Sequence, residues 1–591
     1  MGPSSIRSRP DRLLLLLLGV HALVFWAVVG SGSPMGTASL ECAAGAMADA
    51  ALGPDRAWSL LDTFDGVLGG MFVAALAGLP LFAIVGVTPL AVAFVTWAFA
   101  VAVLLVVYRL LDRHESRSAA LLAVAGLALA PPALSSVSLV FGNWHWTELL
   151  FDYGVALLAL DLLRDPARSR WRWFGLGIAT GLGVVNCFGS APFLVVSWGV
   201  LLVGARRRLG FGLPAAVAGL GAGIVPLLYK ALVHVPFERL GASAPVGFPR
   251  LRPSLDLARL GDLVGPELAW ALHVQDVLPV GPAAGHALGG VWLGIAWVGV
   301  LVALVTARGR GAGAGTVVLL FIGAFAAAYV TVALPIEIRP LEFSNLRETT
   351  HRHLPPLIAA LIVGSAIGWS RLLRGRGAVL GVALLPAALG LSTLVAARTA
   401  DGPGLSAYRA SCFDALGFFA SAWYVQEPAA LQQRCAGWGE HAPACRAGAA
   451  WGVGYYRPPG ALSADSCGSI DPALRTACLR GLGWSVGEQR WGTTAWPSAA
   501  CDDLGSDPDR AACWAGVGFL AGDHLHGMPD RMAAVIRRAP PHRRADVARG
   551  AGYGLGRVYA TAEWSEALCA ALPAGLAEPC ATGVAEALAD R

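Results

Sequence analysis

Long apolar runs alternate with short arginine-bearing stretches over the first two-thirds of the chain. A helix needs about 20 mostly apolar residues to cross a bilayer, and the first run, 13–29, nearly reaches that length. Runs of this kind predict an all-α, polytopic membrane bundle with about eleven spans. The predicted spans are 13–29, 87–108, 118–137, 147–163, 175–190, 191–204, 212–229, 289–306, 314–335, 354–370 and 378–396.

The first run has two readings. Arg7, Arg9 and Arg12 precede it, and a cleavable signal peptide has the same layout. Because many more spans follow, we expect an uncleaved anchor behind a cytoplasmic N-terminus, residues 1–12.

A further apolar stretch, 61–86, leads directly into the span at 87–108. If it crossed the bilayer completely, the arginines after residue 108 would lie outside, against the positive-inside rule. We therefore expect a half-inserted helix lying at the membrane surface.

The arginines predict the topology. They cluster after every second span. The clusters are Arg109, Arg113 and Arg117; Arg164, Arg168, Arg170 and Arg172; Arg206, Arg207 and Arg208; Arg308 and Arg310; and Arg371, Arg374 and Arg376. Because basic loops stay in the cytoplasm, the loops 31–86, 230–288 and 336–353 are expected outside. An odd number of spans then places 397–591 outside as well.

The composition agrees with a membrane protein. Hydrophobic residues make up 56% of the 591 residues and charged residues 14%, against about 25% charged in soluble domains. The mean hydropathy of +0.59 excludes a soluble cytosolic enzyme and a disordered protein. A net charge of +5 without a basic tract argues against nucleic-acid binding. We expect an integral protein of a bacterial inner membrane.

The cysteines test this topology independently. Of the eleven, Cys42 lies in the first outside loop and Cys187 within a span. The other nine lie between Cys412 and Cys580, on the predicted outside. Disulfides persist in oxidising compartments, so the cysteine placement agrees with the arginine pattern.

The C-terminal region is a sequence repeat. Its units begin at residues 412, 445, 478, 513, 547 and 580, at intervals of 33 to 35 residues. The shared pattern is C-x-x-G-x-G-aromatic-x-x-G. A period near 34 predicts a helix-turn-helix unit and a tetratricopeptide-like solenoid. Its concave face would bind a polypeptide or glycan, or the solenoid would only stabilise itself; both readings stay open.

A second cysteine stands 10 to 12 residues upstream of the repeat cysteine in four units, and the unit at Val547 has lost both. Joint loss is expected of a bonded pair. The predicted disulfides are Cys435–Cys445, Cys467–Cys478, Cys501–Cys513 and Cys569–Cys580, with Cys412 left over and able to pair with Cys42. Zinc is the weaker alternative, because zinc sites usually have closer cysteine pairs and histidine partners.

Several short motifs in residues 13–396 resemble one enzyme family. An acidic first outside loop is followed by Gly69–Gly70, a Pro-Leu-Phe-x-x-x-Gly turn at 80–86 and Tyr108-Arg109-Leu110-Leu111. Pro131–Pro132, the outside stretch GNWHWTE at 142–148 and ETTHRHLPPL at 348–357 come later. This order resembles the C-type membrane glycosyltransferases, in the branch similar to dolichyl-phosphate-mannose–protein mannosyltransferases.

The resemblance implies transfer of a sugar from a polyprenyl-phosphate carrier to a protein, glycan or lipid acceptor outside, with a first-loop carboxylate as base. The family often has adjacent Asp-Glu, whereas Asp62-Thr63-Phe64-Asp65 stands here. Asp65 is the favoured base and Asp62 the second choice. The alternative is that either aspartate caps the helix that follows.

A polyprenyl-phosphate leaving group needs cationic partners, and arginine suits phosphate. The candidates share one outside loop: Arg339, Arg347, Arg352 and His353. The alternative interpretation is that these side chains face lipid headgroups. Asn143, His145 and Glu148 lie at the mouth of a span and are candidates for binding sugar hydroxyls or a metal. No metal set or other cofactor is readable from the sequence.

Two further classes of function remain. A non-enzymatic scaffold would bind extracytoplasmic partners through the solenoid. A transporter would need ionisable residues deep within spans, for which Asp152 and Asp161 are the candidates.

Overall fold

The computed structural model is built from helices, and its described residues contain one short ladder, β1 (Arg252–Pro253) antiparallel to β2 (Val332–Ala333). The structure describes residues 12–31, 48, 52, 69–131, 134, 144–165, 170–187, 190–206, 212–228, 252–253, 261, 264–265, 268–269, 272, 282–307, 313–333, 354–373, 413–418, 420–421, 427–456, 467–490, 501–525, 529–558 and 562–589.

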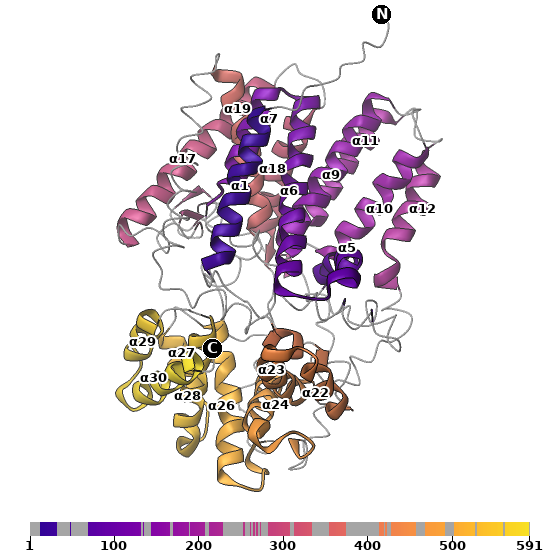
Figure 1. The fold of residues 1–591 in the computed structure, drawn as a ribbon. Coiled ribbons are helices and arrows are strands. Elements are labelled where there is room, and N and C mark those ends of the chain that lie inside the picture. Colours follow the sequence, from indigo (N-terminus) through magenta and orange to yellow (C-terminus); the bar gives the residue numbers. More distant parts are fainter. Residues whose placement is uncertain are drawn as a thin grey trace, which may run out of the picture.

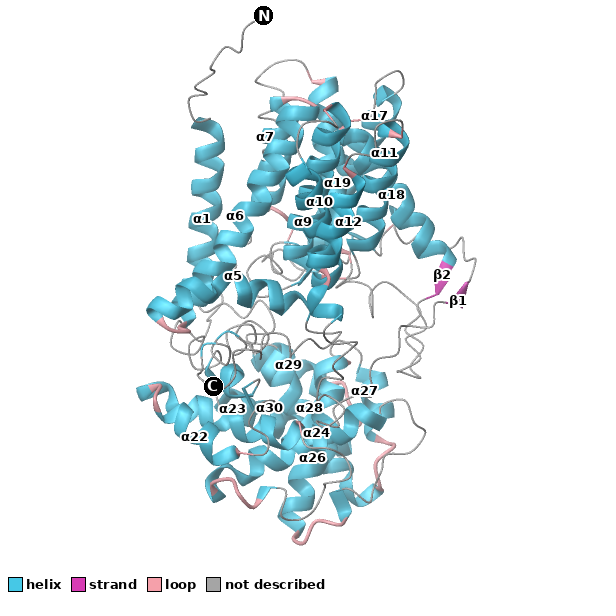
Figure 2. Ribbon diagram, turned by 90° about the vertical axis from the view of Figure 1, so that its right-hand side faces the viewer, coloured by secondary structure: helices cyan, strands magenta, loops and turns pink. Residues whose placement is uncertain are grey.

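The described residues up to 373 form a bundle of apolar helices (Figures 1 and 2). The helices are α1 (Arg12–Ser31), α5 (Gly69–Val85), α6 (Pro89–His114), α7 (Arg117–Ala128), α9 (Trp144–Arg164), α10 (Arg170–Asn186), α11 (Ala191–Ala205), α12 (Leu213–Gly223), α17 (Pro282–Ala307), α18 (Ala314–Thr331) and α19 (Pro355–Leu372). The largest buried cluster inside this bundle joins α6, α7, α9, α17, α18 and α19.

Among the described residues, three helices are long and apolar enough to cross a membrane: Leu90–His114, Ala287–Ala307 and Pro355–Leu372. The prediction of about eleven spans is not met, because six other apolar helical stretches of the described chain are only 10–17 residues long. The run at 118–137 contains α7, which ends at Ala128 shortly before Pro131. Helix α9 is 21 residues long but contains three carboxylates and Arg164. The predicted span at 378–396 lies outside the described residues.

Helix α5 does not run along the bundle. It lies across the end of the bundle that faces the C-terminal region (Figure 2). Gly86, with φ of 75°, and Thr88 form the turn into α6, and the Thr88 side chain accepts the amide hydrogen of Ala91 as an N-cap. The apolar stretch at 61–86 thus contains the crosswise helix that the arginine pattern predicts.

The C-terminal region, called the repeat domain below (described residues between 413 and 589), is a separate array of helices below the bundle (Figure 1). Its α-helices are α22 (Pro428–Ala436), α23 (Ala442–Tyr455), α24 (Arg475–Arg490), α26 (Asp507–His524), α27 (Pro529–Ile536), α28 (Arg544–Val558), α29 (Ala562–Ala570) and α30 (Ala574–Ala589). The 3-10 turns η5 (Gly439–His441), η8 (Pro472–Leu474) and η9 (Pro541–Arg543) lead into α23, α24 and α28.

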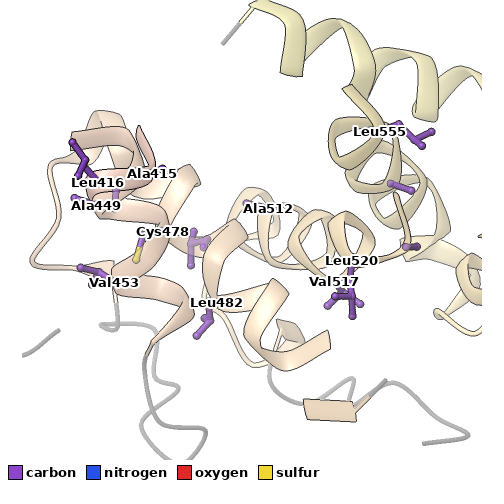
Figure 3. Close-up of a cluster of buried hydrophobic side chains, with 14 of the residues drawn as sticks. Ala415, Leu416, Ala449, Val453, Cys478, Leu482, Ala512, Val517, Leu520 and Leu555 are labelled. Atoms are coloured by element: carbon purple, nitrogen blue, oxygen red, sulfur yellow. The ribbon is translucent and has the colours of Figure 1, made fainter. Parts of the chain in front are cut away.

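The long helices of the repeat domain pack backbone against backbone. A Cβ atom at Gly454 would collide with the carbonyl oxygen of Cys478 in the next long helix, and one at Gly518 with that of Val547. These repeat positions therefore require glycine, because no side chain fits between the helices. Small apolar residues of successive helices fill the remaining core, including Val453, Val517 and other residues labelled in Figure 3.

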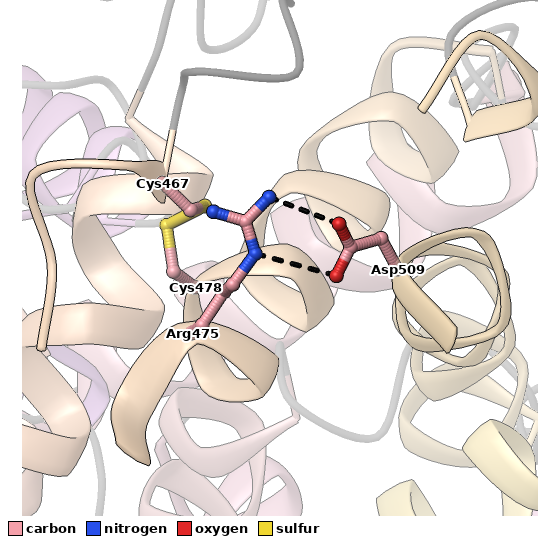
Figure 4. The surroundings of a disulfide bond; sticks show 4 residues. All are labelled: Cys467, Arg475, Cys478 and Asp509. Atoms are coloured by element: carbon pink, nitrogen blue, oxygen red, sulfur yellow. Dashed lines mark hydrogen bonds and ion pairs between the residues drawn. A yellow bond between two sulfur atoms is a disulfide. The ribbon is translucent and has the colours of Figure 1, made fainter. Parts of the chain in front are cut away.

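Four disulfides lie within the repeat domain, and they are the four pairs that the sequence spacing predicts: Cys435–Cys445, Cys467–Cys478, Cys501–Cys513 and Cys569–Cys580. Each joins the start of a long helix to the segment before it. Beside the second bond, Arg475 donates to both carboxylate oxygens of Asp509, tying one repeat to the next (Figure 4). The predicted partners Cys42 and Cys412 lie outside the described residues, and Cys187 is a thiol.

Candidate functional site

Most of the residues predicted for sugar transfer lie outside the described residues. These are Asp62, Asp65, Asn143, Arg339, Arg347, Arg352 and His353. His145 is in the first turn of α9, but its side chain is outside the description. The base and the phosphate-binding arginines therefore remain predictions, and Glu148 is the one predicted site residue whose side chain the structure describes.

Glu148 lies inside the bundle. Its exposed fraction is 0%, and that of Asp152, one helical turn further along α9, is 1%. The hydroxyl of Ser190, which stands just before α11, is the common polar neighbour of both carboxyls. Nearby, the Thr147 hydroxyl donates to Asn186 Oδ1 at 2.8 Å. Glu148 thus belongs to a buried polar cluster between helices and has no solvent-exposed surface with which to bind a sugar.

Asp161, the other carboxylate considered for transport, lies at the end of α9. It accepts from Arg113 at 2.6 Å, and His114 and Arg172 lie 3.2 Å and 3.7 Å from it. Three partners at a helix end make a structural ion cluster. Helix α6 begins beside α5 and ends at His114, so this cluster lies at the end of the bundle opposite α5 and the repeat domain.

A second ion pair joins four helices at the same end. Arg371 of α19 donates to Glu115 at 2.7 Å, and both side chains are only 10% exposed. Glu115 also accepts the amide hydrogen of Gly315 at the start of α18, where a carboxylate is favourable. The same guanidinium donates to the Ala303 carbonyl near the end of α17. We interpret this network as structural, because it connects the ends of four helices.

Six repeat positions converge on the inside of the repeat domain. The residues are Phe418, Trp451, Trp484, Phe519, Tyr553 and Glu586, each six residues after the start of its unit. Trp451 stacks on Tyr553 at 5.7 Å between ring centroids, although three units separate them. Arg557 of α28 pairs with Asp414 in the first unit. The array is therefore wound so tightly that its inner surface is filled by its own aromatic rings.

The last unit carries glutamate where the others carry an aromatic ring. Glu586 pairs with Arg480 at 2.8 Å and also with Arg549. Arg480 lies over the Tyr553 ring at 4.6 Å from its centroid. The recess that these side chains border with Trp451 and Phe519 holds no enclosed space for even a water molecule. The inner face therefore favours self-stabilisation over ligand binding.

The described residues contain no group of three or more histidine, cysteine, aspartate or glutamate side chains arranged to hold a metal. No protein-family model, curated protein or solved structure matches this chain.

Proposed function

We propose that this chain is a polytopic membrane glycosyltransferase that moves a sugar from a polyprenyl-phosphate donor to an acceptor on the extracytoplasmic face. The observation that supports this best is the position of α5. It follows the acidic first loop, begins four residues after Asp65 in the sequence, and lies across the end of the bundle that faces the repeat domain. A crosswise apolar helix is suited to the membrane surface, where a lipid-linked donor presents its phosphate.

The distribution of exposed apolar side chains supports the membrane location. Every large apolar side chain that is more than about one-third exposed lies between residues 13 and 372, within the described part of the chain. Examples are Leu23, Ile84 and Val203. Trp171 is 78% exposed beside Arg170 and Arg172, an arrangement typical of the headgroup region. In the proposed topology several of the shorter apolar helices also lie in the bilayer.

The two ends of the molecule support the proposed orientation. The arginine-rich end of the bundle faces the cytoplasm in the proposal, together with the N-terminus. The repeat domain, with its four disulfides, lies outside, where such bonds persist. Alkaline phosphatase fused after Tyr456 should be active and the same enzyme fused after Ser116 inactive. The reverse result would contradict the orientation.

In the proposed reaction the carboxylate of Asp65, or of Asp62, accepts the proton of an acceptor hydroxyl. The hydroxyl oxygen attacks the anomeric carbon of the sugar, and the bond from that carbon to the carrier phosphate breaks with inversion. Arg352, with Arg339, Arg347 and His353, binds the departing phosphate. This assignment rests on the family resemblance and on residue chemistry.

The test is sugar transfer in membranes supplied with a panel of polyprenyl-phosphate sugars. Asp65→Asn should lose about 10²- to 10⁴-fold in turnover, the usual range for a general base. Asp112→Asn is the matched control, because Asp112 is exposed in the last turn of α6, at the other end of the bundle. If the wild type consumes no donor, the proposal fails and the scaffold reading takes its place.

A further inference from the structure

The bundle contains a carboxyl pair that sugar transfer does not use. Glu148 and Asp152 stand four residues apart in α9, so their Cβ atoms are about 6 Å apart on one helix face. Both side chains are buried, as are Asn186 and Ser190 at the joint between α10 and α11. The surrounding helices α5, α6, α10, α11, α18 and α19 supply mostly apolar side chains.

The oxygens of this cluster are not fully satisfied within the described residues. Both carboxylate oxygens of Asp152 and the hydroxyl of Ser190 are buried without a hydrogen bond that meets ordinary geometry. Ser190 is nevertheless the polar neighbour of both carboxyls. Burying an unsatisfied polar group is unfavourable, and burying a charge is far more so. Buried, unsatisfied oxygens of neighbouring residues, Asp152 of α9 and Ser190 before α11, indicate a missing positive partner.

No described basic side chain supplies that positive charge to Asp152. The described titratable side chains that face the pair are Tyr153 of α9 and Cys187 beyond α10, and neither carries positive charge. Arg113 and His114 of α6 and Arg172 of α10 lie around Asp161, nine residues further along α9, and Arg371 of α19 is paired with Glu115. Helices α5, α11 and α18 contain no charged residue.

We propose that Glu148 and Asp152, with Ser190 and Asn186, form a binding site for one monovalent cation, H⁺ or Na⁺. Carboxylate, hydroxyl and amide oxygens suit either ion, and one positive charge offsets the repulsion between the two carboxylates. Ionisable pairs at this depth in a membrane bundle are typical of ion-binding positions. The site goes beyond the proposed sugar transfer and does not depend on it.

The experiment is thermal unfolding of the purified full-length protein in detergent, followed by intrinsic tryptophan fluorescence. Tm is measured from mildly acidic to alkaline pH in choline chloride. At alkaline pH, Na⁺ or K⁺ then replaces choline over roughly a hundredfold range of concentration at constant ionic strength. We expect the wild-type Tm to fall by several degrees as the pH rises in choline, and Na⁺ to restore it more effectively than K⁺.

Asp152→Asn should remove both responses and keep its Tm at alkaline pH, because an amide needs no cation. Glu148→Gln is the second variant should Asp152→Asn not fold, and Asp112→Asn should follow the wild type. A response to pH without a response to Na⁺ supports the site with H⁺ as its ion. If the wild type and both cluster variants give the same dependence on pH and Na⁺, the proposal is overturned. None of these measurements depends on donor turnover, so they stand apart from the transferase assay.

Discussion

The glycine contacts of the repeat domain lead to a quantitative prediction within a single helix. Helix α30 contains Gly583, which faces α28, and Gly575, which has open space around it. A Cβ at position 583 would collide with the carbonyl oxygen of Arg549 and lie 2.8 Å from the amide nitrogen of Tyr553, whereas ordinary van der Waals contact begins at 3.4 Å. The two helices would have to separate by at least about 0.6 Å against a rigid backbone.

The expected free energies have opposite signs at the two positions. Overpacking of a tight core typically costs about 1–3 kcal/mol, a collision with rigid backbone belongs at the upper end of that range, and alanine recovers about 1 kcal/mol of helix propensity. Gly583→Ala should therefore lower the opening free energy of this region by about 2 kcal/mol. Gly575→Ala makes no new contact and should raise it by about 0.4–1 kcal/mol.

Hydrogen exchange followed by mass spectrometry measures these free energies locally in the full-length, oxidised protein. Peptides from α28 and α30 should exchange about 30-fold faster in Gly583→Ala, since each 1.4 kcal/mol is tenfold. The same peptides should exchange more slowly in Gly575→Ala. If the two alanine variants change exchange equally, the helices are not in backbone contact and the reasoning is refuted.

Three further predictions concern paired groups. Replacing Arg371 with alanine leaves Glu115 buried without its partner and should cost about 3–5 kcal/mol of stability, measured as Tm of the full-length protein in detergent. Replacing Cys501 and Cys513 together with serine should cost about 3 kcal/mol in the fourth unit, measured by hydrogen exchange. The hydrogen bonds from Arg475 hold the pKa of Asp509 below its usual value. The stability that this carboxylate contributes is present above its unfolded pKa, so it should be lost as the pH falls through the lowered one, and Asp509→Asn should lack that part of the acid transition.

Each of these predictions has a matched contrast. Arg113→Ala removes an arginine that is 41% exposed in its pair with Asp161, and such pairs contribute about 0–1 kcal/mol. If Arg113→Ala and Arg371→Ala lower Tm equally, burial does not govern the effect. If reduction of the wild-type disulfides leaves exchange in the fourth unit unchanged, that bond does not stabilise it. If Asp509→Asn unfolds in acid with the same pH dependence as the wild type, the Asp509 carboxylate does not contribute to the loss of stability at low pH.

The features that could be predicted from the sequence are local ones. The disulfide pairs are separated by 10 to 12 residues, so a single repeat contains all the information needed to assign them. Helices α17, α18 and α19 begin within about seven residues of the apolar runs that predicted them. The crosswise position of α5 followed from the charge rule applied to the arginines after residue 108.

The features that were not predicted depend on how helices pack. The convergence of Trp451 and Tyr553 depends on the winding of the array, which the glycine contacts set and no single repeat reveals. Glu148 is buried inside the bundle, and its polar neighbour Ser190 is far away in the sequence. The sequence places Glu148 and Asp152 one helical turn apart, but it does not predict that both side chains are buried beside Ser190. The number of spans was overstated because composition alone does not locate helix ends.

The disulfides of the repeat domain have a consequence for biogenesis. In each of the four bonds a cysteine is joined to the next cysteine along the chain. If the chain emerges N-terminus first into an oxidising compartment, as the proposed orientation requires, every bond can therefore close as soon as its second thiol emerges, without waiting for distant residues or reshuffling by an isomerase. Each bond also spans only 10 to 12 residues, from the end of one unit to the start of the next, so it depends on no residue outside that short segment. The bond is absent at Val547, where neither the repeat cysteine nor the cysteine upstream of it is present, and yet helix α28 packs between α26 and α30.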